Sequence, residues 1–342
     1  MMHGERQDEF KRNQKLEDLL REINSMLQPT EDRVLADFAM PRFPVIFIVG
    51  CARAGSTLML QWLAGTGIFA YPTNLLSRFY RAPYIGAKIQ QLLTDPEFNF
   101  RNEFAGIADA INYASDLGKT TGLLGPNEFW YFWRRFFTYG DIQHLGDKEL
   151  EKADIKKFIA ELAAIEAVFN KPFALKGLII NWNIPFVSNA LDKALFIHVV
   201  RHPLYNAQSL LESRKKYFGT LKHWYSFKPR EYASLKDLSP YEQVAGQVYC
   251  TNSAIARGLE QIDESRKLIL AYEEFCSNPR SVFDSIREKF VQQGMQADWS
   301  YTGPDGFEAT NRRRLAPEET EKVLKAYKQF SGTEITNDEE NH

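Results

Sequence analysis

The chain of 342 residues is about twice the usual size of a domain, so it is long enough for two domains or for one large α/β domain with insertions. Its 42 basic and 44 acidic side chains give a formal charge of −2, which argues against a dedicated nucleic-acid binder and against a polybasic membrane anchor. The aromatic content of 13% is high and indicates a large apolar pocket or interface.

The three cysteines, Cys51, Cys250 and Cys276, lie far apart in the sequence and are odd in number. They therefore predict neither a disulfide framework nor a metal-binding pair, and we expect a reducing, cytoplasmic compartment. The first ten residues lack the apolar stretch of a signal peptide, and no segment has the roughly 18 apolar residues that span a bilayer. We expect no transmembrane segment, and the sequence leaves the oligomeric state open.

The N-terminal 40 residues are predicted to form a helical extension. Residues 7–28 carry leucine and isoleucine at helical spacing among charged residues, as in an amphipathic helix. We expect the main domain to cover residues 41–332. The last residues, 333–342, are polar and acidic, and we expect them to form a flexible tail.

Four short apolar runs are predicted to be strands: residues 44–50, 172–176, 194–200 and 268–272. The first is rich in β-branched residues, as in a parallel strand that is buried on both faces. Helices are expected between and after the strands, and several of them begin at proline, as helices often do. They are residues 56–64, 203–216, 279–293 and 317–330. This alternation predicts an α/β fold with a parallel sheet flanked by helices.

The stretch from about residue 75 to residue 170 is too long for a simple crossover between two parallel strands. We interpret it as a mostly helical insertion that shapes a substrate cleft.

The segment after the first strand carries the clearest chemical signal. Gly50 and Gly55 enclose four residues, which is the glycine spacing of a P-loop, where backbone N–H groups at a helix N-terminus hold a phosphate. A nucleoside-triphosphate loop would have lysine where Ser56 stands, and Arg53 is the only cation of this loop. No strand ends in an acidic residue suited to Mg²⁺. We therefore predict a phosphate site that needs no metal; an ordinary strand-to-helix turn capped by Ser56 is the alternative.

A second candidate anion site follows the third strand. Arg201 comes directly after this strand, and Ser209 follows eight residues later in the helix that Pro203 begins. Both side chains can point to one anion at the carboxyl ends of the strands, where ligands of open α/β sheets bind. Two phosphate sites on one sheet imply a doubly phosphorylated nucleotide.

Taken together, these segments resemble the sulfotransferases that use 3'-phosphoadenosine 5'-phosphosulfate, which have a P-loop-like fold. Residues 47–58 are similar to that family's 5'-phosphosulfate loop, and residues 196–209 to its 3'-phosphate motif. Lys176 ends a strand, as does a family lysine near the leaving group, and residues 272–275 resemble a Tyr-Glu-acidic segment of the family. The resemblance covers about residues 41 to 330 and is weak in the middle.

The resemblance implies a donor site without a metal ion. It assigns the 5'-phosphosulfate and the 3'-phosphate to two groups of residues. These are Arg53, Ala54, Gly55, Ser56 and Thr57 for the former, and Arg201 and Ser209 for the latter. The chain departs from the family pattern at Ala54, where serine is usual, and at His202, where aspartate is common. In the later segment 311–315 one arginine could add a phosphate contact, and a solvated basic run is the alternative.

Sulfuryl transfer to a hydroxyl needs a base for the hydroxyl proton and cations for the charge that develops on the leaving oxygen. Arg53 and Lys176 suit the cationic role. We predict Glu128 as the general base, because a carboxylate inside the aromatic segment 125–133 would be partly desolvated, which raises a carboxyl pKa. A glutamate that only favours the start of a helix is the alternative. Arg78 could face the acceptor or the donor, or lie at the surface.

We therefore expect a sulfotransferase with a helical acceptor-binding insertion. Its acceptor is predicted to be a hydroxyl compound, with a carbohydrate or glycolipid first because sugar sites commonly use aromatic walls. A P-loop nucleotide or small-molecule kinase is disfavoured by the missing lysine at Ser56 and the missing Mg²⁺ aspartate. A non-catalytic nucleotide-binding protein that lost its base stays open as a further alternative.

Overall fold

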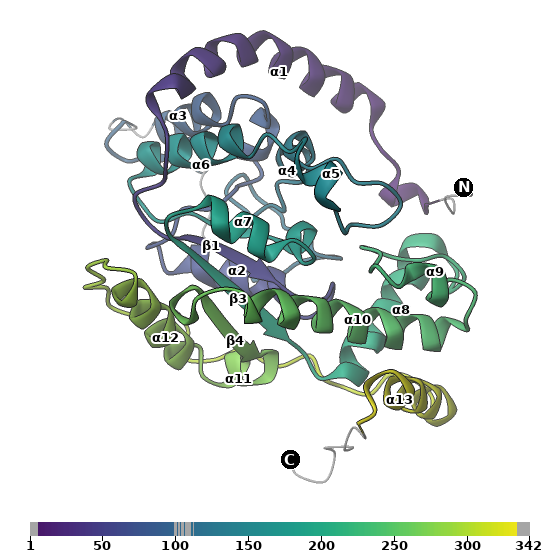
Figure 1. Cartoon of the computed structure of the whole chain (residues 1–342). Helices are drawn as coiled ribbons and strands as arrows, with labels where there is room; N and C mark the ends of the chain where they lie inside the picture. Colours follow the sequence, from purple (N-terminus) through teal and green to yellow (C-terminus); the bar gives the residue numbers. More distant parts are fainter. Residues whose placement is uncertain are drawn as a thin grey trace.

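The computed structural model describes residues 6–98, 101, 103, 106, 111 and 113–333, so most of the predicted tail lies outside the described residues. Four strands form one parallel sheet in the order β2–β1–β3–β4, with helices on both faces (Figure 1). The strands are β1 (Val45–Val49), β2 (Ala174–Lys176), β3 (Ala194–Val200) and β4 (Lys267–Ala271). The predicted α/β fold and its four strands are confirmed.

Alternating side chains of β1 divide the core into two layers, because successive residues of a strand point to opposite faces. On one face Phe47 packs against Phe196 and Trp133, with ring centroids 5.1 and 6.2 Å apart. On the other face Ile46 and Ile48 join a second apolar cluster. Every residue of β1 is buried, which explains why its sequence is apolar throughout rather than alternating.

Three groups of helices cover the sheet and its end. One layer contains α2 (Ser56–Gly65), α11 (Tyr272–Ser277) and α12 (Pro279–Gln292). The opposite layer contains α4 (Trp130–Phe136), α6 (Ile155–Phe169) and α7 (Ile184–Ala190). A third cluster joins α8 (Pro203–Phe218), α10 (Pro240–Glu260) and α13 (Pro317–Ser331). Helices α2, α8, α12 and α13 begin at the predicted residues, whereas the 21-residue α10 was not predicted.

The predicted insertion is mostly helical where the structure describes it. It contains η3 (Leu76–Phe79), α3 (Pro83–Thr94), α4, α5 (Asp147–Leu150) and α6. A buried ion pair fixes α4 on α6: Arg135 donates to both carboxylate oxygens of Glu161, at 2.7 and 2.6 Å. The same guanidinium donates to the backbone carbonyl of Tyr80, so α4 is also fixed next to η3.

The predicted bounds of the N-terminal helix, residues 7–28, are wrong. Helix α1 spans Gln14–Val34, and Asn13 caps its start by accepting a hydrogen bond from the Leu16 N–H group at 3.1 Å. The helix continues past Pro29, although proline removes a backbone donor. The reason is tertiary, because the last turns of α1 carry a buried side chain, Glu31, that fastens them to the insertion.

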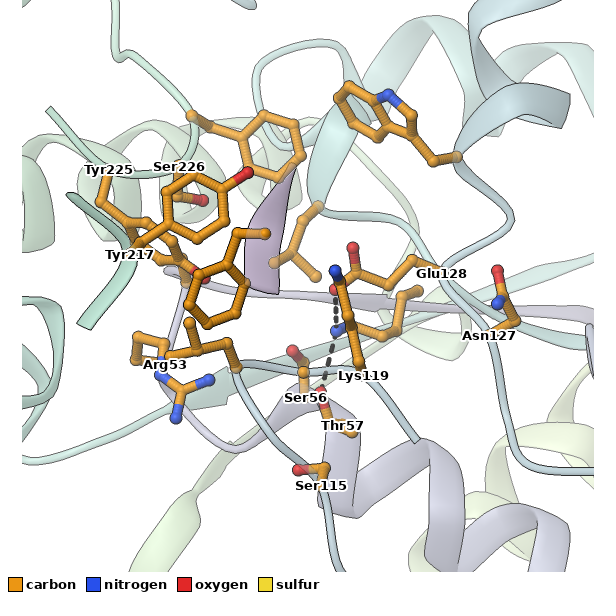
Figure 2. Close-up of a pocket in the computed structure, with 18 of the residues that line it drawn as sticks. Arg53, Ser56, Thr57, Ser115, Lys119, Asn127, Glu128, Tyr217, Tyr225 and Ser226 are labelled. Carbon is orange, nitrogen blue, oxygen red and sulfur yellow. Dashed lines mark hydrogen bonds and ion pairs between the residues drawn. The ribbon is translucent and has the colours of Figure 1, made fainter. Parts of the chain in front are cut away.

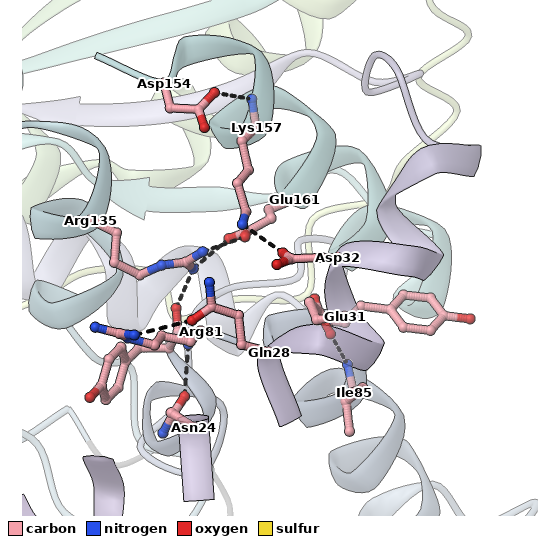
Figure 3. Close-up of polar contacts among 12 residues, drawn as sticks. Asn24, Gln28, Glu31, Asp32, Arg81, Ile85, Arg135, Asp154, Lys157 and Glu161 are labelled. Atoms are coloured by element: carbon pink, nitrogen blue, oxygen red, sulfur yellow. Dashed lines mark hydrogen bonds and ion pairs between the residues drawn. The ribbon is translucent and has the colours of Figure 1, made fainter. Parts of the chain in front are cut away.

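Two fully buried polar side chains attach α1 to the insertion (Figure 3). Asn24 donates to the carbonyl of Arg78 and accepts from the N–H group of Arg81, both at 2.7 Å. Glu31 accepts from two N–H groups in the first turn of α3, at 2.7 and 3.1 Å. These contacts satisfy helix donors that otherwise have no partner, so α1 lies in a defined place across the insertion.

Among the described residues, no helix is both long enough and apolar enough to cross a membrane.

One buried histidine gives the fold a dependence on pH. His198 lies within β3, where its Nε2 atom contacts Oδ1 of Asn252 at 3.2 Å. Burial lowers the pKa of His198 to about 4, whereas the unfolded chain has a histidine pKa of about 6.5. Between these values the unfolded chain binds the extra proton, so the stability that neutral His198 confers is complete above about pH 6.5 and is lost as the pH falls toward 4.

We predict that the wild-type protein loses roughly 3 kcal/mol more unfolding free energy than His198→Gln between pH 7 and pH 4. Urea denaturation of both proteins across this range measures the difference. Parallel pH profiles would show that folding does not lower the pKa of His198.

Candidate active site

The carboxyl ends of the four strands meet at one cavity of about 1580 Å³. The glycine loop follows β1, Lys176 ends β2, Arg201 follows β3 and Tyr272 follows β4. All of these line the cavity. Parallel strands end at the same edge of a sheet, so residues distant in the sequence come together there, as the sequence predicted.

The glycine loop is closely packed on the sheet edge. Gly55 has a φ of 103°, and a Cβ atom built on it would lie 2.3 Å from Cδ2 of Tyr272. Ser56 and Thr57, which open α2, line the cavity, and the first N–H groups of a helix have no partner within the helix. The loop therefore offers backbone donors and the positive end of a helix dipole to an anion.

Arg53 and Ser209 lie together in the structure. The Nε atom of Arg53 donates to Oγ of Ser209 at 3.2 Å. Ser209 is buried, and Arg53 lines the cavity. The sequence predicted that Ser209 shares an anion with Arg201; the structure places it against the arginine of the other predicted site.

Arg201 organises the loops at one end of the cavity. Its guanidinium donates to Oδ1 of Asn311 at 2.9 Å, to the carbonyl of Arg53 at 3.1 Å and to the carbonyl of Thr310 at 2.9 Å. It also lies over the ring of Tyr272, 5.0 Å from the centroid. Arg201 thus joins both predicted anion sites to the 310–311 segment.

Thr310 and Asn311 are site residues that sequence reasoning missed. The sequence left open whether an arginine of segment 311–315 contacts a phosphate or belongs to a solvated basic run; Arg312 pairs with Glu308, and Arg314 pairs with Glu212 at 2.5 Å, both at the surface. The sequence gives one signal for Thr310 and Asn311, which is that their segment comes after the last strand. The contacting groups are a carbonyl, a hydroxyl and an amide, which carry no recognisable motif.

Lys176 is the centre of a short polar chain. Its Nζ atom donates to Oγ1 of Thr57 at 2.9 Å and to Oε1 of Glu128 at 2.5 Å; Figure 2 labels these two partners. The lysine is 6% exposed and the carboxylate 50% exposed. The structure therefore brings together the predicted cation, the predicted base and the first turn of α2.

The surroundings of Glu128 differ from the predicted ones. Phe129, Phe132 and Trp133 of the same segment lie in the core, and the carboxylate is half exposed. The predicted aromatic burial of this carboxylate is wrong, because α4 turns those rings into the core layer next to β1. Its main partner is Lys176.

Aromatic side chains form the far wall of the cavity. Trp130 packs near Phe227 at 5.7 Å, and Tyr217 near Tyr225 at 5.7 Å between centroids (Figure 2 shows Tyr217 and Tyr225 opposite Glu128). Trp130 was part of the predicted aromatic segment. The wall from residues 217–232 was missed, although its aromatic residues are dense in the sequence.

The segment before α1 borders the same cavity. The ring of Phe10 lies 4.8 Å from that of Tyr217, and the N–H group of Gln7 donates to the carbonyl of Tyr217 at 3.0 Å. The ammonium of Lys119 lies 5.7 Å from the Phe10 ring centroid. The N-terminal segment is therefore part of the cavity rim, which the sequence did not predict.

Within the part of the chain that the structure describes, no group of three or more His, Cys, Asp or Glu residues could hold a metal ion. The expected independence of a metal stays a prediction.

Comparisons with known proteins agree with this geometry. A family model described as the sulfotransferase family matches residues 44–291, which contain all four strands, the glycine loop and Arg201. No curated protein matches the chain.

Solved structures show a similar architecture. Sulfotransferase STF1 from Mycobacterium tuberculosis is 13% identical, with 91% of this chain and 81% of that chain covered and a TM-score of 0.53. Sulfotransferase STF9 from Mycobacterium avium is 14% identical, with 88% and 71% covered and a TM-score of 0.47. At 13% identity the likeness to STF1 bears on the fold alone. The likeness to STF9 supports no conclusion, because its TM-score is 0.47.

The close packing of the glycine loop predicts an unequal response of two glycines. Gly55→Ala should lower the unfolding free energy by about 2 to 5 kcal/mol, since it adds a steric clash with Tyr272 to backbone strain. Gly67→Ala is the matched control, with a φ of 71° and no atom within 4 Å of the added Cβ, and should cost only about 1 to 2 kcal/mol. Urea denaturation measures both, and equal losses would mean that Gly55 is not packed as described.

Proposed function

This chain belongs to the sulfotransferase family, and we propose that it transfers the sulfuryl group of 3'-phosphoadenosine 5'-phosphosulfate to a hydroxyl of a carbohydrate or glycolipid. The observation that carries the proposal is the contact of Lys176 with both Thr57 and Glu128. It joins an anion-binding helix N-terminus, a buried cation and a carboxylate at the edge where ligands of parallel sheets bind.

The residues present fit the donor. Gly55 lets the loop turn closely against Tyr272, the start of α2 offers N–H groups without a partner in the helix, and Arg53 and Lys176 supply positive charge. Arg201, with Thr310 and Asn311 fixed beside it, would hold the 3'-phosphate. Ser209 would act through Arg53, because its Oγ atom accepts a hydrogen bond from Nε of Arg53.

The chain's own residues supply the chemistry of the transfer. The acceptor oxygen forms a bond to sulfur, and the bond from sulfur to the bridging phosphate oxygen breaks with its electron pair left on that oxygen. The hydroxyl proton passes to Glu128, and Lys176 meets the charge on the leaving oxygen. Both roles are compatible with their direct contact in the free protein.

The Lys176–Glu128 ion pair also suggests how donor binding prepares the base. An anion that binds beside Lys176 competes with Glu128 for the same ammonium group. The carboxylate is half exposed, so it can leave the lysine at little desolvation cost. Donor binding would therefore release Glu128 toward an acceptor hydroxyl.

We further propose a reducing, cytoplasmic location, which is supported by the three cysteines being free and buried.

Donor selectivity gives one test. Arg201→Ala should weaken the binding of 3',5'-diphosphoadenosine by about 2 to 5 kcal/mol, because it removes a buried, hydrogen-bonded charge. Adenosine 5'-phosphosulfate, which lacks the 3'-phosphate, should lose far less. Isothermal titration calorimetry measures both, with Arg312→Ala, an exposed arginine of the neighbouring segment, as the control that should change neither. Equal losses for the two ligands would remove Arg201 from the 3'-phosphate site.

The function itself is tested by transfer of radiolabelled sulfate from the donor to sugars and glycolipids in the presence of EDTA. The wild-type enzyme should turn over, and Glu128→Gln should lower kcat roughly 10²- to 10⁴-fold with donor affinity intact, because an amide cannot take a proton. The acid limb of the pH–rate profile should also disappear from the residual activity.

Glu17→Gln is the matched control, since Glu17 lines the same cavity but contacts Tyr131 instead of Lys176. It should leave kcat within a few-fold of wild type. If Glu128→Gln behaves in the same way, Glu128 only positions Lys176. An absolute need for Mg²⁺ together with phosphate transfer from ATP would show a kinase and contradict the proposed function.

A further inference from the structure

Three arginines in the cavity wall beyond Glu128 lack a carboxylate partner. Arg12 precedes α1, Arg78 lies in η3 and Arg134 lies in α4, and all three line the cavity. None of them forms an ion pair within the described part of the chain. We call Arg12, Arg78 and Arg134 the outer arginines.

The elements that carry or adjoin the outer arginines contact one another. Both α1 and α4 contact η3. Tyr131 of α4 lies 5.2 Å from Tyr80 between ring centroids, and its hydroxyl donates to Glu17 of α1 at 2.5 Å. Burial raises the pKa of Tyr131, and the positive charge of Arg12 opposes that rise, so Arg12 lies within electrostatic reach of α4. The guanidinium of Arg134 lies 5.7 Å from the ring centroid of Trp130.

The carboxylates among the described lining residues neutralise this region only in part. Glu17 accepts a hydrogen bond from neutral Tyr131 and keeps its negative charge, so it offsets one of the three outer arginines. Glu128, Asp141 and Glu308 each pair with a lysine or an arginine other than the outer arginines. Unpaired cations in a concave wall give the cavity a positive potential and attract an anionic ligand.

We propose that the acceptor carries an anionic group, a carboxylate or a phosphate or sulfate ester, which the outer arginines bind while its hydroxyl faces Glu128. This inference rests on the proposed function and narrows its acceptor class. Arginine presents paired N–H donors that match the two oxygens of such a group.

The spacing along α4 fits an acceptor of the size of a sugar. Glu128 stands two residues before α4, and Trp130 and Arg134, four residues apart, lie on one face of that helix. The two positions are about 6 Å apart along the helix axis. The aromatic rings of Trp130 and Tyr131 lie between Glu128 and Arg134 in the sequence, so an apolar sugar face can pack there while the anion continues to Arg134.

A different role for the outer arginines would be to attract the donor, which is itself an anion. The donor residues, however, lie on other elements, namely the glycine loop, β2 and the segments that follow β3 and β4. Loss of the outer arginines should therefore change acceptor binding and leave donor affinity unchanged.

The test uses the full chain saturated with 3',5'-diphosphoadenosine and two matched pairs of probes. One pair is p-nitrophenyl β-glucoside and p-nitrophenyl β-glucuronide, which differ by a carboxylate; the other is glucose and glucose 6-phosphate. Calorimetry should show the anionic member of at least one pair binding about tenfold more tightly. The pair that responds tells whether a carboxylate or a phosphate is preferred. Raising the salt from about 50 mM to 500 mM should reduce the preference.

The variant Arg12→Gln/Arg78→Gln/Arg134→Gln should lose this preference and keep its affinity for 3',5'-diphosphoadenosine. The control Arg21→Gln/Arg33→Gln/Arg287→Gln removes the same charge from positions outside the cavity lining and should keep the preference. Equal binding of both members in each pair, no binding of any probe, or a preference that survives in the outer-arginine variant would overturn the inference. Failure of the wild type to bind 3',5'-diphosphoadenosine or to transfer sulfate would instead contradict the proposed function.

Discussion

Because the four strands run parallel, the segments that follow them all start at the same edge of the sheet. The order β2–β1–β3–β4 therefore places Lys176, the glycine loop and Arg201 side by side, although they are far apart in the sequence. The pairing of Ile48 with Lys176 sets the height of the lysine beside α2, so its contact with Thr57 depends on this register. The same parallel arrangement requires cover on both faces, which is why β1 is apolar throughout.

The buried ammonium group of Lys176 needs a negatively charged partner. A buried ammonium next to the positive end of α2 is unfavourable unless negative charge is near. In the free protein Glu128 provides that charge from the insertion, across the cavity from the sheet. In the proposed reaction an anionic donor would provide it as well, so the cation proposed to bind the donor would also set where the carboxylate lies. One lysine would thereby connect the proposed donor side of the cavity with the proposed acceptor side.

The sheet and the donor loop could be predicted because their signals are local. Continuous apolar runs marked the four strands, and the glycine spacing with Arg53 marked the loop. The surroundings of Glu128 could not be predicted, since the direction of the neighbouring rings depends on how α4 packs on α6 and β1. The hydrogen bonds from Arg201 to Thr310 could not be predicted either, because a backbone carbonyl and a hydroxyl carry no sequence signature. The end of α1 was misplaced because buried Glu31, a tertiary contact, outweighs the local effect of Pro29.

One part of the cavity rim lies outside the residues that match the sulfotransferase family model. The glycine loop, Lys176 and Arg201 lie within the residues that match the sulfotransferase family model, whereas α1 and the segment before it precede residue 44. Buried Asn24 and Glu31 fix α1 on the insertion, so Phe10 at the rim and the nearby Arg12 occupy defined places although they are far from the sheet. Substitutions in this N-terminal part can therefore alter the cavity rim without changing the pairing of the strands.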